Sequence, residues 1–490
     1  MNRRQFLKSG AAAAAALAAP GALAVPGTLA VPGTMAQLGG RLPFAEGRES
    51  QPNVLVIYTD QQSCWSLSSY GADLIETPHI DSLAREGALF GNFFTNSAVC
   101  TPSRGCFQTG RYPHAHGAYK NNIPLGRDEV TFAQVLRDRG YDTGYAGKWH
   151  LDGNPKPGWV KKSRSMGYDD CRFMFNRGHY KKVVEQAEGN PKFSPYKVIG
   201  DSETYTTDWL ARKTIDFVDE ERENPFCFMV SIPDPHTPFT VRAPYDTMFE
   251  PEKMTIPATL NQTDLPRWIK EKRETKGGKP PSEKRLRSMK AKYLGEVKLI
   301  DDAVGAMLDS LKAKGILDNT IVVFTTDHGE YMGEHGLMNK NNLYEPAYRL
   351  PLLVRWPEKI AARTRVDRIV SAVDFQATLL GLMGIAPCDR HQGHDASPFL
   401  RGETTAWDDA AQIHHSSLER AGIFTPEFEL AYVKGSEAIL FDRQRDPDQV
   451  TNLFGRKKYK KVVDELFERI IAHHEETESP AAGWLKEMAS

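Results

Sequence analysis

The chain has 490 residues, and its 62 basic and 63 acidic residues leave a formal net charge of -1 at pH 7. This balance argues against nucleic acid or an acidic membrane as the main partner, so any anion must be bound locally. The length suits one large α/β domain with a small one beside it. Six scattered cysteines are too few for a disulfide framework in a chain of this size.

Residues 1–36 are predicted to be an export signal followed by a low-complexity linker. Arg3 and Arg4 open a basic segment, and the apolar run from Ala11 to Ala19 is too short to span a bilayer as a permanent helix. The segment resembles the twin-arginine signal, although Asn2 stands where Ser or Thr is usual. This resemblance implies the twin-arginine export machinery as a partner and a periplasmic or secreted location. A basic amphipathic surface segment is the alternative interpretation.

Continuous apolar runs rich in β-branched residues are typical of strands that are buried on both faces of a parallel sheet. Such runs occupy residues 53–59, 226–232 and 320–326, and a short strand-like segment lies within residues 141–149. Helical patterns alternate with them at residues 77–90, 129–139 and 292–314. The alternation predicts a doubly wound α/β domain, with a mostly parallel central sheet flanked by helices on both faces.

The catalytic domain is predicted to span residues 45–386, because the pattern changes after that point. Short strands and one helix are then expected at residues 411–415, 430–434, 439–442 and 457–474. They predict a small C-terminal subdomain, residues 387–490, with an antiparallel sheet and a helix. Two inserts, residues 154–197 and 242–290, lack clear periodicity and are interpreted as surface excursions.

Polar residues follow the ends of three predicted strands, where open α/β sheets bind their ligands. Asp60 follows the first strand, His236 lies in a turn after a later one, and Asp327 and His328 follow the last. A lone Asp in such a place is more often a turn former or a helix cap. Two strand ends with metal-binding groups, and a Cys-Thr-Pro-Ser-Arg segment between them in sequence, favour a catalytic site instead.

That segment, Cys100 to Arg104, resembles the signature of the type I sulfatases, and the match continues through Thr109-Gly110-Arg111. A Cys-x-Pro-Ser-Arg pattern should arise by chance in roughly one chain of this size per thousand. Similar family segments occur at residues 147–151, 235–238, 327–330 and 335–340. The resemblance implies the fold of the alkaline phosphatase superfamily, and a dedicated maturation enzyme that converts Cys100 into formylglycine. A small buried hydrophobe is the alternative reading of an isolated cysteine.

Cleavage of a sulfate ester requires a nucleophile, stabilised charge on the sulfuryl oxygens and a proton for the leaving alkoxide. A hydrated aldehyde at position 100 offers one hydroxyl that can attack sulfur to give a covalent sulfo-enzyme. Its second hydroxyl can then expel sulfate as the aldehyde re-forms. A serine could perform only the first of these two steps.

One divalent cation is predicted to bind at Asp60, Gln61, Cys100, Asp327 and His328. Carboxylates favour hard cations, so Ca²⁺ is preferred. An imidazole ligand moves the preference toward Mn²⁺, and Mg²⁺ is a further candidate. The commonest family pattern has two adjacent acids after the first strand and Asp-Asn after the later one, whereas this chain has Asp-Gln and Asp-His.

The resemblance also implies roles for five basic residues. Arg104, one turn after the cysteine if a helix starts there, would hold the hydrate and the sulfate. Lys148 and His150 are two residues apart, so on a strand they would share a face, where the family places a sulfate-binding lysine and a histidine that contacts the hydrate. His236 resembles the histidine that protonates the leaving oxygen. Lys340 resembles a second sulfate-binding lysine.

The sequence therefore predicts a sulfuric ester hydrolase that acts on a carbohydrate, aryl or alkyl sulfate. The Asp-Gln and Asp-His pairs also resemble the phosphonate monoester and phosphodiester hydrolases of the same superfamily. A non-catalytic binder of sulfated glycans is the alternative from another class of protein. Basic residues between positions 267 and 290 could contact such a glycan, although a run of this kind is more often a solvated surface.

Overall fold

The computed structural model describes residues 51–275 and 278–489. The predicted export signal and linker, residues 1–36, lie outside the described residues. Within the described part, no helix combines the length and the apolar character that crossing a membrane requires.

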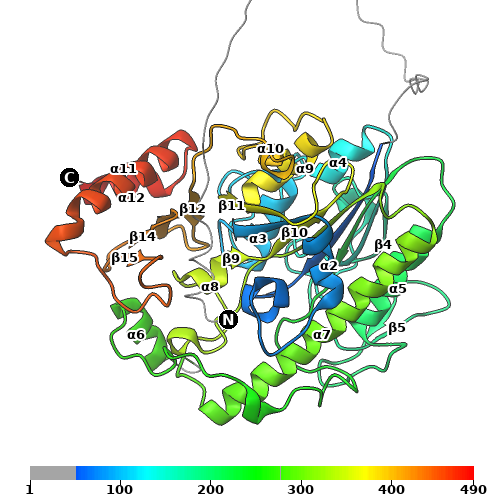
Figure 1. Ribbon diagram of the computed structural model, residues 1–490, viewed down its shortest axis with the longest axis horizontal. Coiled ribbons are helices and arrows are strands. Elements are labelled where there is room, and N and C mark those ends of the chain that lie inside the picture. Colours follow the sequence, from blue (N-terminus) through cyan, green and yellow to red (C-terminus); the bar gives the residue numbers. More distant parts are fainter. Residues whose placement is uncertain (1–50, 276–277, 490) are drawn as a thin grey trace, which may run out of the picture.

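Among the described residues, nine strands form a central sheet in the order β11-β2-β10-β8-β1-β7-β3-β4, with β9 paired to β2 (Figure 1). They are β1 (Asn53–Thr59), β2 (Ala88–Phe94), β3 (Asp142–Lys148), β4 (Asp170–Phe175), β7 (Phe226–Ser231), β8 (Thr320–Thr326), β9 (Arg349–Leu350), β10 (Leu352–Arg355) and β11 (Thr364–Ser371). Only β9 and β10 run antiparallel to their neighbours. Strand β1 is parallel to both β7 and β8, so these three strands end at the same edge of the sheet.

Helices cover both faces of this sheet, which explains why its central strands are apolar throughout. Val54, Val56 and Tyr58 of β1 belong to the core beneath α3, α4 and α9, whereas Leu55 and Ile57 belong to the core beneath α2, α5 and α7. The helices are α2 (Pro78–Glu86), α3 (Cys100–Thr109), α4 (Phe132–Arg137), α5 (Thr206–Asp219), α7 (Glu283–Ala313) and α9 (Phe375–Leu382). The predicted fold class is confirmed.

Two of the predicted helices have different ends in the structure. The helix expected to run toward Phe90 stops at Glu86, because residues 88–94 pair with β10 and β11 as strand β2. The helix expected over residues 129–139 is limited to α4, since the side chain of Thr131 caps its first turn. Both predictions were too long because apolar periodicity does not show where the chain turns back.

The insert of residues 242–290 is more regular than its composition suggested. It contains α6 (Arg267–Glu274) and the beginning of α7. The latter helix starts at Glu283 instead of Lys292, and Ser282 caps it by accepting a backbone hydrogen bond. This cap, combined with strong helix formers, outweighs the lack of an apolar stripe at the exposed end.

The insert of residues 154–197 is not purely a surface excursion either. It supplies β4, the edge strand of the central sheet, which pairs in parallel with β3. A small hairpin of β5 (Val183–Val184) and β6 (Lys192–Phe193) follows. Because β4 is only half-buried, its sequence does not show the continuous apolar run by which the central strands were recognised.

A second, antiparallel sheet follows toward the C-terminal end, as predicted (Figure 1). Its strands are β12 (Ala411–His414), β13 (Arg420–Phe424), β14 (Phe428–Val433) and β15 (Ile439–Asp442). Two helices, α11 (Lys460–Glu476) and α12 (Ala481–Ala489), pack on it in place of the single one expected. The rings of Phe94 and Phe424, 4.7 Å apart, join the two sheets. A domain boundary between residues 386 and 387 remains a prediction.

Short elements complete the described chain. Two are α-helical, α8 (Glu345–Tyr348) and α10 (Ser397–Leu400). The 3₁₀ turns are η1 (Cys64–Ser66), η2 (Ser68–Tyr70), η3 (Lys162–Arg164), η4 (Pro251–Lys253), η5 (Glu334–Gly336), η6 (Ala372–Asp374) and η7 (Lys457–Tyr459). Most of them lie in the connections between larger elements, where the chain changes direction.

Four histidines pack together where the small sheet meets the central domain. Nε2 of His414 on β12 lies 2.8 Å from Nε2 of His473 on α11, and its ring stacks on that of His114 with centroids 5.1 Å apart. His474 is buried, and neither of its ring nitrogens has a hydrogen-bond partner among the described residues. Burial lowers the pKa of His473 and of His474 to about 3.

We expect this histidine cluster to make the protein sensitive to acid. A histidine whose pKa falls from 6.5 to about 3 on folding is neutral in the folded chain, so its contribution to stability is present above pH 6.5 and is lost as the pH falls toward 3. The free energy of unfolding should decrease by about 2 kcal/mol per such histidine between pH 7 and pH 5.

Thermal unfolding midpoints between pH 7 and pH 4 measure this effect. His474→Leu should make the midpoint less dependent on pH, because the buried leucine cannot take up a proton. His79→Leu, at an exposed histidine, should leave the pH dependence unchanged. The same slope in all three proteins would contradict the expectation.

Candidate active site

Helix α3 begins at Cys100 and places Arg104 one turn further along, which confirms the geometry expected for a helix that starts there. Every residue of the helix is buried, and Cys100 is only 2% exposed. The unpaired amides of the first helical turn carry a partial positive charge. Position 100 is therefore suited to an anion, or to a group that becomes one.

Asp60 and Asp327 follow two neighbouring parallel strands, as the sequence predicted. The last residues of β1 and β8 are register partners, so the chain leaves the sheet at the same point in both cases. Both carboxylates are fully buried. Potential ligand atoms of Asp60, Cys100, Asp327 and His328 all lie within 4.8 Å of one another. Two strand ends and the start of α3 thus meet in one place.

These four side chains form a donor set that fits a divalent cation. Two carboxylates supply hard oxygen atoms, and Nε2 of His328 lies 3.1 Å from Sγ of Cys100 and 3.9 Å from Oδ1 of Asp60. Nδ1 of His328 faces the carbonyl oxygen of Gly329 at 3.1 Å, which directs Nε2 into the group. Burial lowers the pKa of His328 to about 4, so its imidazole is neutral at neutral pH.

Gln61 borders the donor set in a left-handed backbone conformation, with a φ of 66°. Its backbone amide donates to Oδ1 of Asp327 at 3.0 Å. Its side-chain amide nitrogen donates to Glu330, and its side-chain oxygen accepts from Nζ of Lys340. A positive φ is costly for a residue with a Cβ, so these contacts must hold the conformation.

The guanidinium group of Arg104 connects the two carboxylates to the neighbouring strands. It donates to Oδ2 of Asp327 at 3.0 Å and to Oδ2 of Asp60 at 3.2 Å. It also donates to the carbonyl oxygen of Lys148 and to Oγ of Ser231, at 2.8 Å each. With this many partners the planar group cannot rotate, so it provides a fixed positive charge beside both acids.

Lys148 is the last residue of β3, and its side chain is fully buried. Its Nζ atom donates to Asp60 and to Nε2 of His179 at 2.9 Å, and it lies 3.8 Å from Sγ of Cys100. Burial by itself raises the pKa of Asp60, but the charge of Lys148 and the other basic groups around it hold that pKa well below its usual value.

His150 reaches the site by a different route from the predicted one. The strand ends at Lys148, and His150 has a left-handed backbone with a φ of 57°, so the two residues do not share a strand face. Trp149 between them is buried, as expected. Burial, followed by the charges of Lys148 and Arg104, lowers the pKa of His150 well below its usual value. The side chain is therefore close to both cations despite the broken alternation.

His236, His179 and Lys340 form the outer layer of the site. The two imidazole rings stack with their centroids 3.6 Å apart. Nζ of Lys340 donates to Nε2 of His236 at 2.7 Å, while Nδ1 of His236 faces the carbonyl oxygen of Thr237, also at 2.7 Å. His236 is 9% and the His179 side chain 19% exposed, so this layer is the part of the site nearest to solvent.

Sequence reasoning missed His179, because it lies in the insert of residues 154–197 and belongs to no recognised motif. It also missed Asp234, whose carboxylate accepts from Nζ of Lys181 at 2.5 Å and from the hydroxyls of Tyr205 and Thr207 at 2.9 and 2.8 Å. These bonds anchor the turn that carries His236. Asp234 stands directly before the Pro-His-Thr-Pro segment, which was the one signal available for it.

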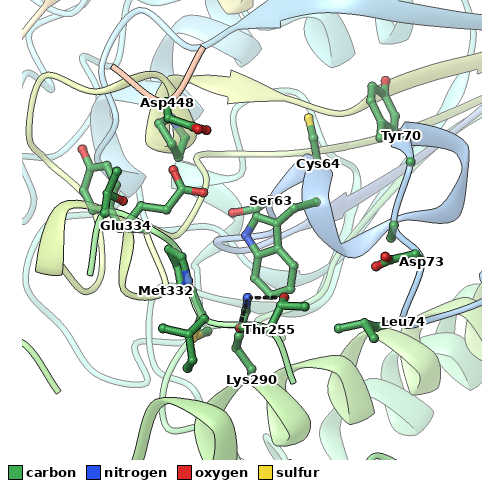
Figure 2. Close-up of a pocket in the computed structure, with 18 of the residues that line it drawn as sticks. Ser63, Cys64, Tyr70, Asp73, Leu74, Thr255, Lys290, Met332, Glu334 and Asp448 are labelled. Carbon is green, nitrogen blue, oxygen red and sulfur yellow. Dashed lines mark hydrogen bonds between the residues drawn. The ribbon is translucent and has the colours of Figure 1, made fainter. Parts of the chain in front are cut away.

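A cavity of about 410 Å³ is lined by residues that neighbour the site in sequence, among them Ser63 and Met332 (Figure 2). Its lining includes Ser63, Cys64, Asp73, Lys290 and Glu334, and Lys290 donates to the carbonyl oxygen of Thr255 at 2.9 Å. The hydroxyl of Ser63 accepts from the backbone amide of Glu330 at 2.8 Å, which links the lining to the site. None of the predicted site residues lines the cavity. The cavity is therefore separate from the candidate active site.

All the predicted site residues are gathered at the edge of the sheet where β1, β7 and β8 end. They are Asp60, Gln61, Cys100, Arg104, Lys148, His150, His236, Asp327, His328 and Lys340. Acids, a histidine and a candidate nucleophile at the strand ends of a mostly parallel α/β sheet are typical of metal-assisted ester hydrolases.

Comparison with known proteins identifies the family. The model described as Sulfatase matches residues 52–385, and the one described as N-sulphoglucosamine sulphohydrolase, C-terminal, matches residues 333–476. An ulvan-active sulfatase of Formosa agariphila is 30% identical over 436 residues, which cover 85% of this chain and 80% of that protein. The chain therefore belongs to the sulfatase family of the alkaline phosphatase superfamily.

Two solved structures share the fold. One, a complex with its substrate D-glucosamine-2-N,6-O-disulfate, has a TM-score of 0.70 and 24% identity, covering 88% of this chain and 99% of that chain. The other, a phosphonate monoester hydrolase of Agrobacterium radiobacter, has a TM-score of 0.72 and 24% identity, covering 88% of this chain and 97% of that chain. At this identity both structures support the architecture alone.

The family model of the twin-arginine translocation signal matches residues 1–20. This match confirms the predicted signal and supports a periplasmic or secreted location. The signal itself lies outside the described residues.

Proposed function

We propose that the chain hydrolyses sulfate esters through a formylglycine formed from Cys100, with the help of one divalent cation. The observation that carries the proposal is the meeting of position 100 with Asp60, Asp327 and His328 inside 4.8 Å, at the start of a buried helix. A single oxidised cysteine there would have a cation, two acids and the positive end of α3 around it. No other described cysteine has such surroundings.

Asp60, Asp327 and His328 would hold the cation, with Gln61 as a further candidate ligand. The bound cation would neutralise charge on the sulfate and on the hydrated aldehyde, whose two hydroxyls supply attack on sulfur and the later release of sulfate. The two carboxylates favour Ca²⁺, whereas the imidazole of His328 favours Mn²⁺, and Mg²⁺ is a third candidate.

The remaining residues have distinct tasks in this proposal. Lys148, whose Nζ lies 3.8 Å from Sγ of Cys100, and Arg104, which bonds both acids of the donor set, are fixed cations that would stabilise the charge that develops at the nucleophile. Lys340 lies in the outer layer, where it can bind a sulfuryl oxygen. Nδ1 of His236 is directed at a backbone carbonyl and Nε2 accepts from Lys340, so Nε2 would first have to take up a proton, which it could then pass to the leaving oxygen. His150 would contact the hydrate.

Burial of Cys100 has a consequence for maturation. At 2% exposure inside a fully buried helix, the thiol cannot enter the active site of another enzyme once the chain has folded. A formylglycine-generating enzyme must therefore act before folding. Because twin-arginine export moves folded proteins, the conversion would also have to precede export.

The metal content of the purified protein tests the proposed metal site independently of enzyme activity. Replacing Asp327 by Asn removes one charged ligand and also leaves Arg104 with one carboxylate fewer, so we expect bound divalent metal to fall from about one per chain to below about 0.1. Elemental analysis of the purified protein measures this. Asp309→Asn, the same change on an exposed part of α7, should keep the metal. Full metal content in the Asp327 variant would exclude it as a ligand.

Within the superfamily, a phosphonate monoester hydrolase remains the second candidate, because the Asp-Gln and Asp-His pairs fit that branch too. Parallel measurement of aryl sulfate and aryl phosphonate hydrolysis separates the two. The proposal predicts a higher kcat/KM for the sulfate ester. A higher value for the phosphonate would reassign the activity.

A further inference from the structure

Two cations that the proposed mechanism does not use, Lys156 and Arg177, lie near the site. Lys156 and Arg177 both lie in the insert of residues 154–197. The backbone amide of Arg177 donates to the carbonyl oxygen of Pro157 at 3.0 Å, so the two segments lie side by side. Among the described residues, neither side chain is paired with a carboxylate.

An aromatic column holds Lys156 in place. Its Nζ atom lies 4.3 Å from the ring centroid of Tyr196. Tyr196 stacks on Tyr180 at 5.1 Å, Tyr180 on Phe193 at 4.4 Å, and Phe193 on Trp159 at 5.4 Å. A lysine on a surface is normally free to rotate, whereas this one forms the last layer of a packed stack. Its charge is therefore held in a defined position.

Both cations are close to the catalytic group. His179, two residues after Arg177, accepts a hydrogen bond from Nζ of Lys148 at 2.9 Å. After burial, the charges of Arg177 and Lys148 are the causes that lower the pKa of Lys156, so the three cations are near enough to repel one another. Arg177 donates to the side-chain oxygen of Asn122, which leaves most of its N–H groups without a described partner.

We propose that Lys156 and Arg177 form a second anion-binding site, which receives a sulfate or carboxylate group on the same glycan as the ester that is cleaved. This inference rests on the proposed sulfatase activity. Cations that repel one another in the free protein are stabilised by an anion bound between them. The guanidinium group can grip a carboxylate or sulfate with two parallel hydrogen bonds, and the ammonium group adds a point charge. The substrate class is then a glycan with at least two anionic groups.

Steady-state kinetics with three substrates tests the inference. They are a monosulfated hexosamine, the same hexosamine with a second sulfate, and a monosulfated disaccharide that contains a uronate. Lys156→Gln and Arg177→Gln should each lower kcat/KM for a doubly anionic substrate by about tenfold, mainly through KM. The monosulfated hexosamine should stay within about twofold of wild type. Whichever doubly anionic substrate shows the loss identifies the second anion as sulfate or carboxylate.

Lys161→Gln is the matched control, since it removes the same charge from an exposed lysine of the same insert. It should leave all three substrates unchanged. Losses of equal size for singly and doubly anionic substrates, or no loss at all, would overturn the anion site while leaving the sulfatase activity in place.

A lack of turnover with every sulfate ester would instead count against the proposed function. In that case calorimetric binding of the disulfated hexosamine to the Cys100→Ala chain still decides the inference. Affinity about tenfold weaker after the added Lys156→Gln change supports the second site. Unchanged affinity rules it out.

Discussion

Replacing Cys100 by alanine is expected to lower kcat/KM for sulfate esters by about 10⁴-fold or more, because it removes the group that becomes the nucleophile. The fold should survive, since alanine suits a helix and the change removes a single sulfur atom from α3. The thermal unfolding midpoint should stay within about 5 °C of that of the wild-type protein. Initial rates on a sulfate ester, combined with a thermal unfolding curve, measure both quantities.

Cys106 on the same helix provides the matched control. It is fully buried, with Sγ 3.8 Å from Nε2 of His116, and it is not part of the donor set. Cys106→Ala therefore repeats the chemical change without touching the nucleophile, and its activity should remain within about threefold of wild type. Wild-type rates in the Cys100 variant would refute the assignment of the nucleophile.

His236→Ala is expected to have the second largest effect, and the effect should depend on the leaving group. An alkyl or sugar alkoxide needs a proton as it departs, so its sulfate ester should be cleaved about 10²- to 10³-fold more slowly. An activated aryl sulfate, whose phenolate leaves without help, should lose less than about tenfold. Plots of log kcat/KM against the pKa of the leaving alcohol should therefore be steeper for the variant.

A control variant and a comparison of alkyl with aryl esters test the role of His236. His391→Ala changes a half-buried histidine whose Nδ1 faces the carbonyl oxygen of Cys388 in its own loop, and it should leave the dependence on the leaving group as it is in the wild type. A loss of equal size for alkyl and aryl esters in the His236 variant would remove this histidine as the proton donor. Its contact with Lys340 would then indicate a role in binding sulfate.

Much of the fold could be predicted because the central strands are buried on both faces. β1 and β8 appear as unbroken apolar runs, and their carboxyl ends carry Asp60 and Asp327. The rule that parallel strands end at one edge then brings the two acids together without knowledge of the structure. β4 was missed because it is half-buried and lacks a continuous apolar run, whereas β13 is mostly buried but only five residues long, so its apolar run is too short to stand out.

The outer layer of the site could not be predicted in the same way. His179 comes from an irregular insert, and only the folded chain shows it stacked on His236 from a distant segment. The left-handed backbone at His150 replaces the strand alternation that the spacing from Lys148 suggested. Local patterns describe regular elements, whereas these side chains are positioned by the tertiary packing of loops.

The state of residue 100 in protein from its native host tests the central claim most directly. Mass spectrometry of the tryptic peptide that ends at Arg104 reports it, with the peptide containing Cys106 as an internal reference. We predict that the sulfur of Cys100 has been replaced by oxygen with the loss of two hydrogens, and that the peptide reacts with a hydrazide reagent as an aldehyde. An unmodified thiol at position 100 in a preparation that hydrolyses sulfate esters would contradict the account.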